Sequence, residues 1–126
     1  MNTLLVIDDD LPICTYFTKY FANKDYKVFS ATTGEEGLAI VKERKPDLIF
    51  LDIIMDGRSG IYLLQEIKKI DDKAKVIMLT ALKDQKIIAE CKKGGAIDYI
   101  TKPFNLEELE KDIIPRALKS KQRDNL

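Results

Sequence analysis

The stretch Leu48-Ile49-Phe50-Leu51-Asp52 places a carboxylate directly after four large apolar residues. A short, continuous apolar run of this kind is typical of a strand that is buried on both faces, as in a parallel sheet. Similar runs recur along the chain, and we expect five strands, at residues 3–8, 27–31, 47–52, 75–80 and 97–101. The segments between these runs show the apolar spacing that predicts helices.

The alternation of strands and helices predicts an α/β protein with right-handed βαβ crossovers. We therefore predict a flavodoxin-like, doubly wound parallel sheet of five strands in the order 2-1-3-4-5, with five helices on its two faces. Asn105 has the properties of an N-cap for the fifth helix, and Gly94-Gly95 those of a stop signal for the fourth. Pro115 lies inside the fifth helix, so we expect a kink or a shortening near residues 111–114.

Composition limits the classes of protein that the chain could belong to. Its 126 residues suit one domain, which we place at residues 1–120, with a polar tail or the start of a linker at residues 121–126. Lys and Arg number 21, as do Asp and Glu, so the basic excess of a nucleic-acid-binding protein is missing and we expect no direct nucleic-acid binding. No apolar run is long enough to span a membrane, and we expect no membrane association.

Cys14 and Cys91 both fall inside predicted helices. We interpret them as reduced, buried thiols of a cytoplasmic protein, with a disulfide as the less favoured alternative. The chain contains no His, which argues against a metal site built on these cysteines.

Residues suited to phosphate chemistry follow four of the predicted strands. Asp8 and Asp9 follow the first strand, Asp52 the third, Thr80 the fourth and Lys102 the fifth. In an open α/β sheet, ligands bind outside the carboxyl ends of the strands, at the point where the strand order reverses. We therefore expect these side chains to converge on a site for a divalent cation and a phosphoryl group.

Three carboxylates that lie close together repel one another, and a hard cation with oxygen ligands relieves that repulsion. Mg²⁺ fits this site because it accepts one or two carboxylates together with phosphate oxygens. A simpler interpretation is that Asp8, Asp9 and Asp10 only cap the first helix. Helix capping explains Asp10, but it does not explain Asp52 or Lys102, which end other strands.

Four segments of the chain resemble the receiver domain of two-component response regulators, in the same order and with similar spacing. They are Val6-Ile7-Asp8-Asp9-Asp10, Pro46-Asp47-Leu48-Ile49-Phe50-Leu51-Asp52, Leu79-Thr80-Ala81 and Asp98-Tyr99-Ile100-Thr101-Lys102-Pro103-Phe104. The resemblance covers nearly the whole chain. It implies a phosphoprotein that takes a phosphoryl group from a sensor histidine kinase or a phosphotransfer protein, and that signals to a protein target or a tethered effector domain.

The resemblance also implies how the site is divided among the residues. Asp52 would be the phosphoacceptor, forming an aspartyl phosphate. Asp9 and Asp52 would bind Mg²⁺ through their side chains, Ile54 through its backbone carbonyl, and Asp8 through a bound water. Lys102 would pair with Asp52 at rest and with the phosphoryl group afterwards.

The implied switch involves two residues. Thr80 would donate its hydroxyl to the phosphoryl group, and Tyr99 would rotate inward to fill the space that Thr80 leaves. The output face would consist of the fourth helix, the fifth strand and the fifth helix. There Ile87 and Ile88 are adjacent, so either one of them is half exposed or both are core residues.

The family pattern also predicts the isomer of the Lys102–Pro103 peptide bond and the rate at which the aspartyl phosphate is hydrolysed. By resemblance, the peptide bond between Lys102 and Pro103 would be cis. Ile54 and Leu82 stand where family members gate the hydrolytic water, and both are bulky and apolar, so we expect slow self-dephosphorylation. Asp56 stands where proline is usual, and we interpret it as a solvated loop residue.

Two alternatives to a phosphorylation-controlled signalling switch remain open. One is a pseudo-receiver that acts only as a protein-binding scaffold, although the set of Asp9, Asp52, Thr80 and Lys102 is intact. The other is an aspartate-nucleophile phosphatase of the haloacid dehalogenase type, for which Asp8 and Asp10 have the right spacing but the loops are too short for a cap. We expect no enzymatic turnover beyond self-phosphorylation and slow self-dephosphorylation.

Overall fold

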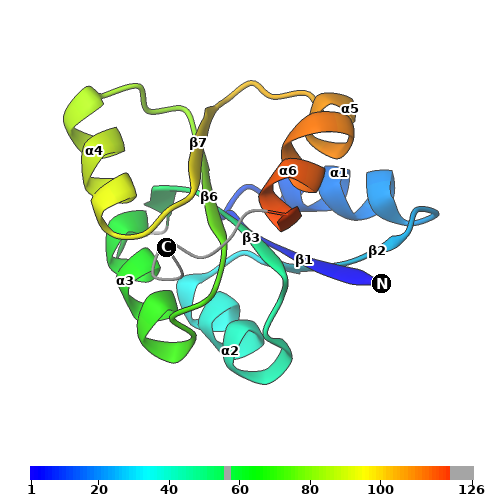
Figure 1. Ribbon diagram of the computed structural model, residues 1–126, viewed down its shortest axis with the longest axis horizontal. Helices are drawn as coiled ribbons and strands as arrows, with labels where there is room; N and C mark the ends of the chain where they lie inside the picture. The colour runs from blue at the N-terminus through cyan, green and yellow to red at the C-terminus, as the bar shows by residue number, and fades with distance from the viewer. Residues whose placement is uncertain (56–57, 120–126) are drawn as a thin grey trace.

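The computed structural model of the chain describes residues 1–55 and 58–119. Helices cover both faces of a twisted parallel sheet (Figure 1). In chain order the elements are β1 (Asn2–Ile7), α1 (Leu11–Phe21), β2 (Tyr26–Ala31), α2 (Gly34–Arg44), β3 (Leu48–Leu51), β4 (Ile54–Met55), β5 (Arg58–Ser59), α3 (Gly60–Ile70), β6 (Val76–Thr80), α4 (Gln85–Lys93), β7 (Asp98–Thr101), α5 (Leu106–Glu108), the π-helical turn η1 (Leu109–Ile113) and α6 (Ile114–Lys119). Asp56 and the tail at 121–126 lie outside the described residues, so their interpretation and the domain limit at residue 120 stay predictions.

The large sheet has the strand order β2-β1-β3-β6-β7, and every pair of neighbouring strands is parallel. This is the predicted order 2-1-3-4-5, so the doubly wound fold is confirmed. The register of the central strands is held at their amino ends by a clamp between Thr3 and Asp47. The Thr3 amide donates to Asp47 Oδ2 at 2.7 Å, and the Asp47 amide donates to the Thr3 carbonyl at 3.0 Å.

Alternate residues of the buried strands point to opposite faces of the sheet, because side chains alternate along a strand. One face packs against α2, α3 and α4, and the other against α1 and the last helical segments (Figure 1). On β3, for example, Ile49 and Leu51 belong to the first core and Leu48 and Phe50 to the second. The two cores explain why the strands read as continuous apolar runs. Cys14 and Cys91 are free and buried, one in each core, as expected.

The helices begin and end largely as the sequence predicts. Asn105 accepts hydrogen bonds at Oδ1 from the amides of Glu107 and Glu108, and Gly95, after the C-cap Gly94, has a φ of 106° that favours glycine. The capping expectation for Asp10 is confirmed in position only. Asp10 occupies the N-cap position of α1, but its side chain makes no capping hydrogen bond.

Two features differ from the expectation. Residues 54–55 and 58–59 form a small antiparallel ladder that the sequence pattern does not predict, because its strands have only two residues each. Pro115 does not shorten the last helix, which continues to Lys119; the chain instead forms the π turn η1 at Leu109–Ile113, directly before α6. Among the described residues, no helix is both long and apolar enough to cross a membrane.

Candidate functional site

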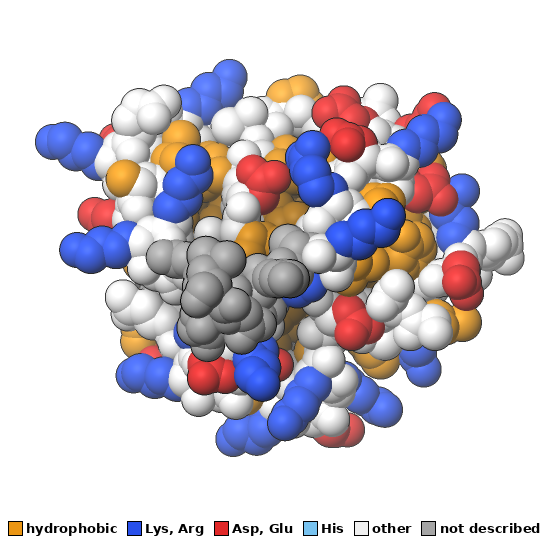
Figure 2. All heavy atoms as spheres, in the orientation of Figure 1, with side chains coloured by type: hydrophobic (Ala, Val, Ile, Leu, Met, Phe, Trp, Pro, Cys, Tyr) orange, Lys and Arg blue, Asp and Glu red, His pale blue; other side chains and the backbone are white. Residues whose placement is uncertain are grey.

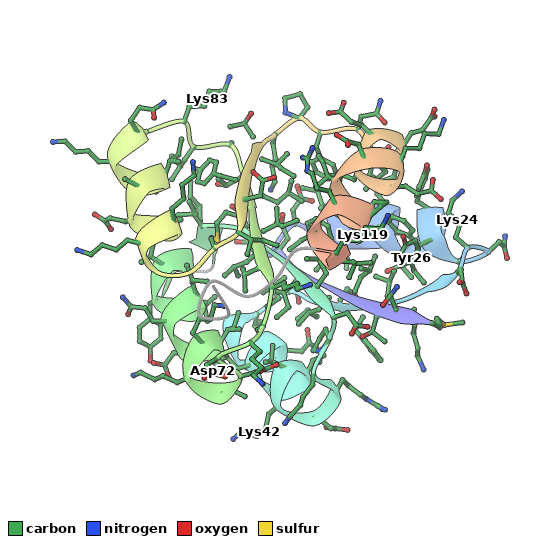
Figure 3. The ribbon with its side chains drawn as sticks, viewed as in Figure 1. Lys24, Tyr26, Lys42, Asp72, Lys83 and Lys119 are labelled. Atoms are coloured by element: carbon green, nitrogen blue, oxygen red, sulfur yellow. The ribbon has the colours of Figure 1, made fainter. Side chains whose placement is uncertain are left out.

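The side chains expected to converge lie at one edge of the large sheet. The strands β1, β3, β6 and β7 run in the same direction, and their registers pair Ile7 with Leu51, Leu51 with Met78, and Thr80 with Thr101. Residues that follow these positions therefore emerge together at the carboxyl edge. In Figure 3 this edge lies at the top of the view, toward Lys83 in the β6–α4 loop, while Lys42 and Asp72 mark the opposite edge.

The carboxylates form a compact cluster. One oxygen from each of Asp8, Asp9 and Asp52 lies within 4.8 Å of the others. Asp8 and Asp52 are 1% and 6% exposed, whereas Asp9 is exposed. Asp8 Oδ1 accepts a hydrogen bond from the Asp10 amide at 2.9 Å, and Asp52 Oδ1 accepts one from the Ile54 amide at 3.2 Å. These bonds orient both buried carboxylates.

Lys102 bridges the two buried carboxylates. Its ammonium group lies 3.0 Å from Asp52 Oδ2 and 2.7 Å from Asp8 Oδ2. The resemblance implies the pair with Asp52, but it does not anticipate the shorter pair with Asp8. Strands β1 and β3 are neighbours, so a lysine that reaches Asp52 from β7 also meets the residue after β1.

The site carries more negative than positive charge, which favours a bound cation. Burial raises the pKa of Asp8, and the hydrogen bond from Lys102, which acts in the opposite direction, does not offset this effect. Burial alone would lower the pKa of Lys102, but its bonds to Asp8 and Asp52 prevail and raise it. One ammonium therefore faces three carboxylates. The donors are hard oxygens, which are the ligands that Mg²⁺ prefers, so these residues fit this ion.

The loop that carries Lys102 is anchored on α1 by aromatic contacts. The Phe104 ring centroid lies 5.6 Å from that of Phe17, which in turn lies 5.1 Å from that of Phe50 in β3. Phe17 and Phe50 are fully buried, and replacing such a ring by Ala typically costs about 3–5 kcal/mol. The Lys102–Pro103 bond is cis, as the resemblance implies.

The two residues of the implied switch contact the same loop residue. Thr80 is fully buried, and its hydroxyl oxygen accepts a hydrogen bond from the Leu82 amide at 3.4 Å. The hydroxyl of Tyr99 donates to the Leu82 carbonyl at 2.7 Å, and its half-buried ring packs against the core beside α4. The Leu82 backbone therefore links the site to β7.

The α4 side of the implied output face has two half-buried isoleucines. Ile87 packs against the core and Ile88 is also half-buried, so neither alternative for this pair holds fully. Near the phosphoacceptor, Ile54 is 57% exposed and Leu82 is half-buried. Their role in shielding an aspartyl phosphate stays a prediction.

The model of the response regulator receiver domain family matches residues 4–114. The chain belongs to this family. Receiver domains are phosphorylation-controlled signalling switches that bind Mg²⁺ at an acidic pocket and interact with histidine kinases and downstream effectors. The chain is therefore a module of two-component signal transduction.

Three relatives illustrate the similarity of this receiver domain to known proteins. It is 34% identical to sporulation initiation phosphotransferase F of Bacillus subtilis (strain 168) over 115 residues, covering 91% of this chain and 92% of the relative. It is 40% identical to the probable C4-dicarboxylate response regulator DctR of the same organism over 109 residues, or 84% of this chain. There it spans 48% of the relative's length.

The third relative is a chain of a solved structure, the CheX–CheY–BeF₃–Mg²⁺ complex from Borrelia burgdorferi. It superimposes on this receiver domain with a TM-score of 0.82 at 27% identity, covering 91% of this chain and 88% of that chain. The fold is therefore shared over nearly the full length of both chains.

Proposed function

We propose that this chain is a signalling switch whose Asp52 accepts a phosphoryl group from the phosphohistidine of a sensor histidine kinase or of a phosphotransfer protein. The observation that carries the proposal is the buried pair of carboxylates, Asp8 and Asp52, bridged by Lys102 at 2.7 and 3.0 Å. The similarity to a phosphotransferase and to a complex that contains BeF₃ and Mg²⁺ supports it.

In the proposed transfer, a carboxylate oxygen of Asp52 attacks the phosphorus atom. The bond from phosphorus to the imidazole nitrogen breaks, and a bond to the Asp52 oxygen forms. Lys102, whose ammonium already lies beside Asp52, then pairs with a phosphoryl oxygen. Stabilisation of charge on the transferring group supplies most of the catalysis in reactions of this kind.

The residues proposed to hold Mg²⁺ are Asp9, Asp52 and the backbone carbonyl of Ile54, with Asp8 acting through a water. When bound, Mg²⁺ would offset negative charge on the phosphoryl group. Within the protein itself, the hydrogen bond from the Ile54 amide orients the Asp52 carboxylate. The exposed Asp9 completes the cluster from the solvent side.

The signal is proposed to pass through Thr80 and Tyr99. Thr80 would donate its hydroxyl to the phosphoryl group, and the Leu82 backbone, which contacts both side chains, would move with it. Tyr99 would then rotate inward. This rotation would change the face made by α4, β7 and α5, to which a downstream protein or a tethered effector would bind. We propose no direct nucleic-acid binding: on the face shown in Figure 2, acidic and basic side chains are interspersed.

We also propose that the chain has no turnover beyond self-phosphorylation and slow self-dephosphorylation, because Ile54 and Leu82 shield the aspartyl phosphate. The free, buried cysteines support a reducing, cytoplasmic setting.

The test is incubation with Mg²⁺ and acetyl phosphate, followed by measurement of the intact mass, with Asp52→Asn alongside. We expect the wild-type protein alone to gain one phosphoryl group. A gain in both proteins would assign the acceptor elsewhere. No gain, with or without a kinase, would favour the scaffold alternative, and continuous release of inorganic phosphate would favour the phosphatase.

A further inference from the structure

Gly60 makes an unusually close backbone contact with the residues of the phosphoacceptor. It is the first residue of α3, it is buried, and its amide donates to the Ile53 carbonyl at 2.6 Å. A methyl group at this position would stand 2.5 Å from Ile53 Cα and would collide with the carbonyl oxygen of Asp52. Only glycine allows the two backbones to approach this closely.

The collision could not be relieved by rotating a side chain, because the atoms involved belong to the backbone. The Asp52 amide donates to the Ile7 carbonyl at 3.1 Å, and Leu51 is paired with strands on both sides. The end of β3 is therefore held in the middle of the sheet. Any displacement must fall on the backbone after Asp52 and on the start of α3.

The backbone of residues 52–54 orients the carboxylate of Asp52. Ile54 donates its amide to Asp52 Oδ1 at 3.2 Å, and it pairs with Ser59, the residue directly before Gly60. A shift at position 60 would therefore move Ile54 and turn the Asp52 carboxylate relative to Lys102, which lies 3.0 Å away.

We propose that Gly60 is a positioning residue for phosphoryl transfer, acting through the backbone of residues 52–54 to hold the Asp52 carboxylate and the Ile54 carbonyl in place. The proposal rests on the function proposed above for Asp52. Errors of about 1 Å in the position of reacting groups can cost about a hundredfold in rate, so a small displacement is sufficient.

Gly34 provides a matched control. It is also the first residue of a helix, α2, and is also buried. A methyl group there would stand 2.7 Å from Cδ2 of Leu63, the end of a flexible core side chain, rather than from backbone atoms. Both substitutions by Ala add the same methyl group and the same helix propensity, so they differ only in what they contact.

The experiment compares wild-type protein, Gly60→Ala and Gly34→Ala at a temperature where circular dichroism shows all three to be folded. The initial rate of phosphorylation by acetyl phosphate is measured by intact mass, and Mg²⁺ affinity by calorimetry without a phosphodonor. We expect Gly60→Ala to be phosphorylated about ten- to a hundredfold more slowly and to bind Mg²⁺ more weakly. Gly34→Ala should match the wild type in both measurements, whatever its thermal midpoint.

The proposal is overturned if folded Gly60→Ala matches the wild type, or if Gly34→Ala loses as much rate. Should Gly60→Ala be partly unfolded, the comparison is repeated in trimethylamine N-oxide, which favours compact states. If it remains unfolded there while Gly34→Ala folds, the residue supports the fold rather than the site, which also overturns the proposal. Failure of the wild type itself to be phosphorylated would instead refute the proposed function.

Discussion

At the scale of single residues, the buried charge of Asp8 is the costly feature of the site. Lys102 donates to both Asp8 and Asp52, so one ammonium compensates two buried carboxylates. Burial raises the pKa of Asp8 despite this bond, which means that ionised Asp8 is less favourable in the folded protein than in the unfolded chain. A bound cation would remove this penalty.

We therefore expect Asp8→Asn to raise the thermal midpoint at neutral pH in the absence of Mg²⁺, by roughly 4 °C, equivalent to about 1 kcal/mol. The folded pKa of Asp8 lies above its unfolded pKa. Below the unfolded pKa, Asp8 is protonated in both states and costs no stability; the cost appears as pH rises through the folded pKa, where the buried group ionises. The advantage of Asn should accordingly shrink at about pH 4. Thermal unfolding in EDTA tests this, with Asp10→Asn, an exposed neighbour, as control. A lower midpoint for Asp8→Asn at neutral pH would show that its pair with Lys102 is net stabilising.

At the scale of elements, the π turn η1 accommodates Pro115 and contacts α1. Pro115 has no amide hydrogen to donate to the Lys111 carbonyl. The preceding amide, that of Ile114, donates to the Leu109 carbonyl five residues earlier, rather than to the residue four earlier as in an α-helix. Within this turn, Glu110 accepts a hydrogen bond from the Tyr20 hydroxyl at 2.8 Å. It also lies 3.4 Å from the ammonium of Lys24, which is labelled in Figure 3 and lies in the turn after α1. The contact ties the last helix to the first.

We expect Tyr20→Phe to lower the thermal midpoint at neutral pH, and the difference from wild type to vanish in acid. The hydrogen bond from Tyr20 lowers the pKa of Glu110. The resulting stabilisation is present above the unfolded pKa of Glu110 and is lost as pH falls through the folded one. Thermal unfolding across this pH range measures the effect, and Tyr16→Phe, half exposed on the same helix, is the control. A difference that persists unchanged in acid would mean that packing, not the charge of Glu110, is responsible.

At the scale of the whole molecule, the site at the carboxyl edge and the face made by α4, β7 and α5 share one loop. The Leu82 backbone accepts from Tyr99 and donates to Thr80, so a movement at either end reaches the other. Tyr99 lies on β7, one of the two edge strands of the large sheet. This geometry supports the proposed coupling between phosphorylation of Asp52 and the surface on which we propose that a partner binds.

Phosphorylation by acetyl phosphate is expected to change amide hydrogen exchange in α4 and β7, but not in α2. Tyr99→Phe, which retains the ring and loses the bond to Leu82, should reduce the change in β7. Exchange measured by mass spectrometry on phosphorylated and unphosphorylated protein tests this, with Asp52→Asn treated identically as the control. A change confined to the loops around Asp52 would contradict the coupling.

Much of this architecture could be predicted from local sequence features. Continuous apolar runs predict the buried strands, because a strand that is buried on both faces needs apolar residues at nearly every position. Right-handed crossovers with helices on both faces suit the flavodoxin-like strand order, and residues that follow parallel strands must share an edge. The convergence of Asp8, Asp9 and Asp52 was predictable for this reason.

Contacts between distant segments were decided only by the tertiary structure. The pair of Lys102 with Asp8, the bond from Tyr20 to Glu110 and the approach of Gly60 to Asp52 join residues whose separation depends on how strands and helices pack. The short β4–β5 ladder and the π turn likewise produce no periodic spacing of apolar residues in the sequence. A sequence records which residues must be buried and where strands end, because the hydrophobic effect acts on each position. Distances of a few ångströms between side chains and backbones arise only when the layers are packed together.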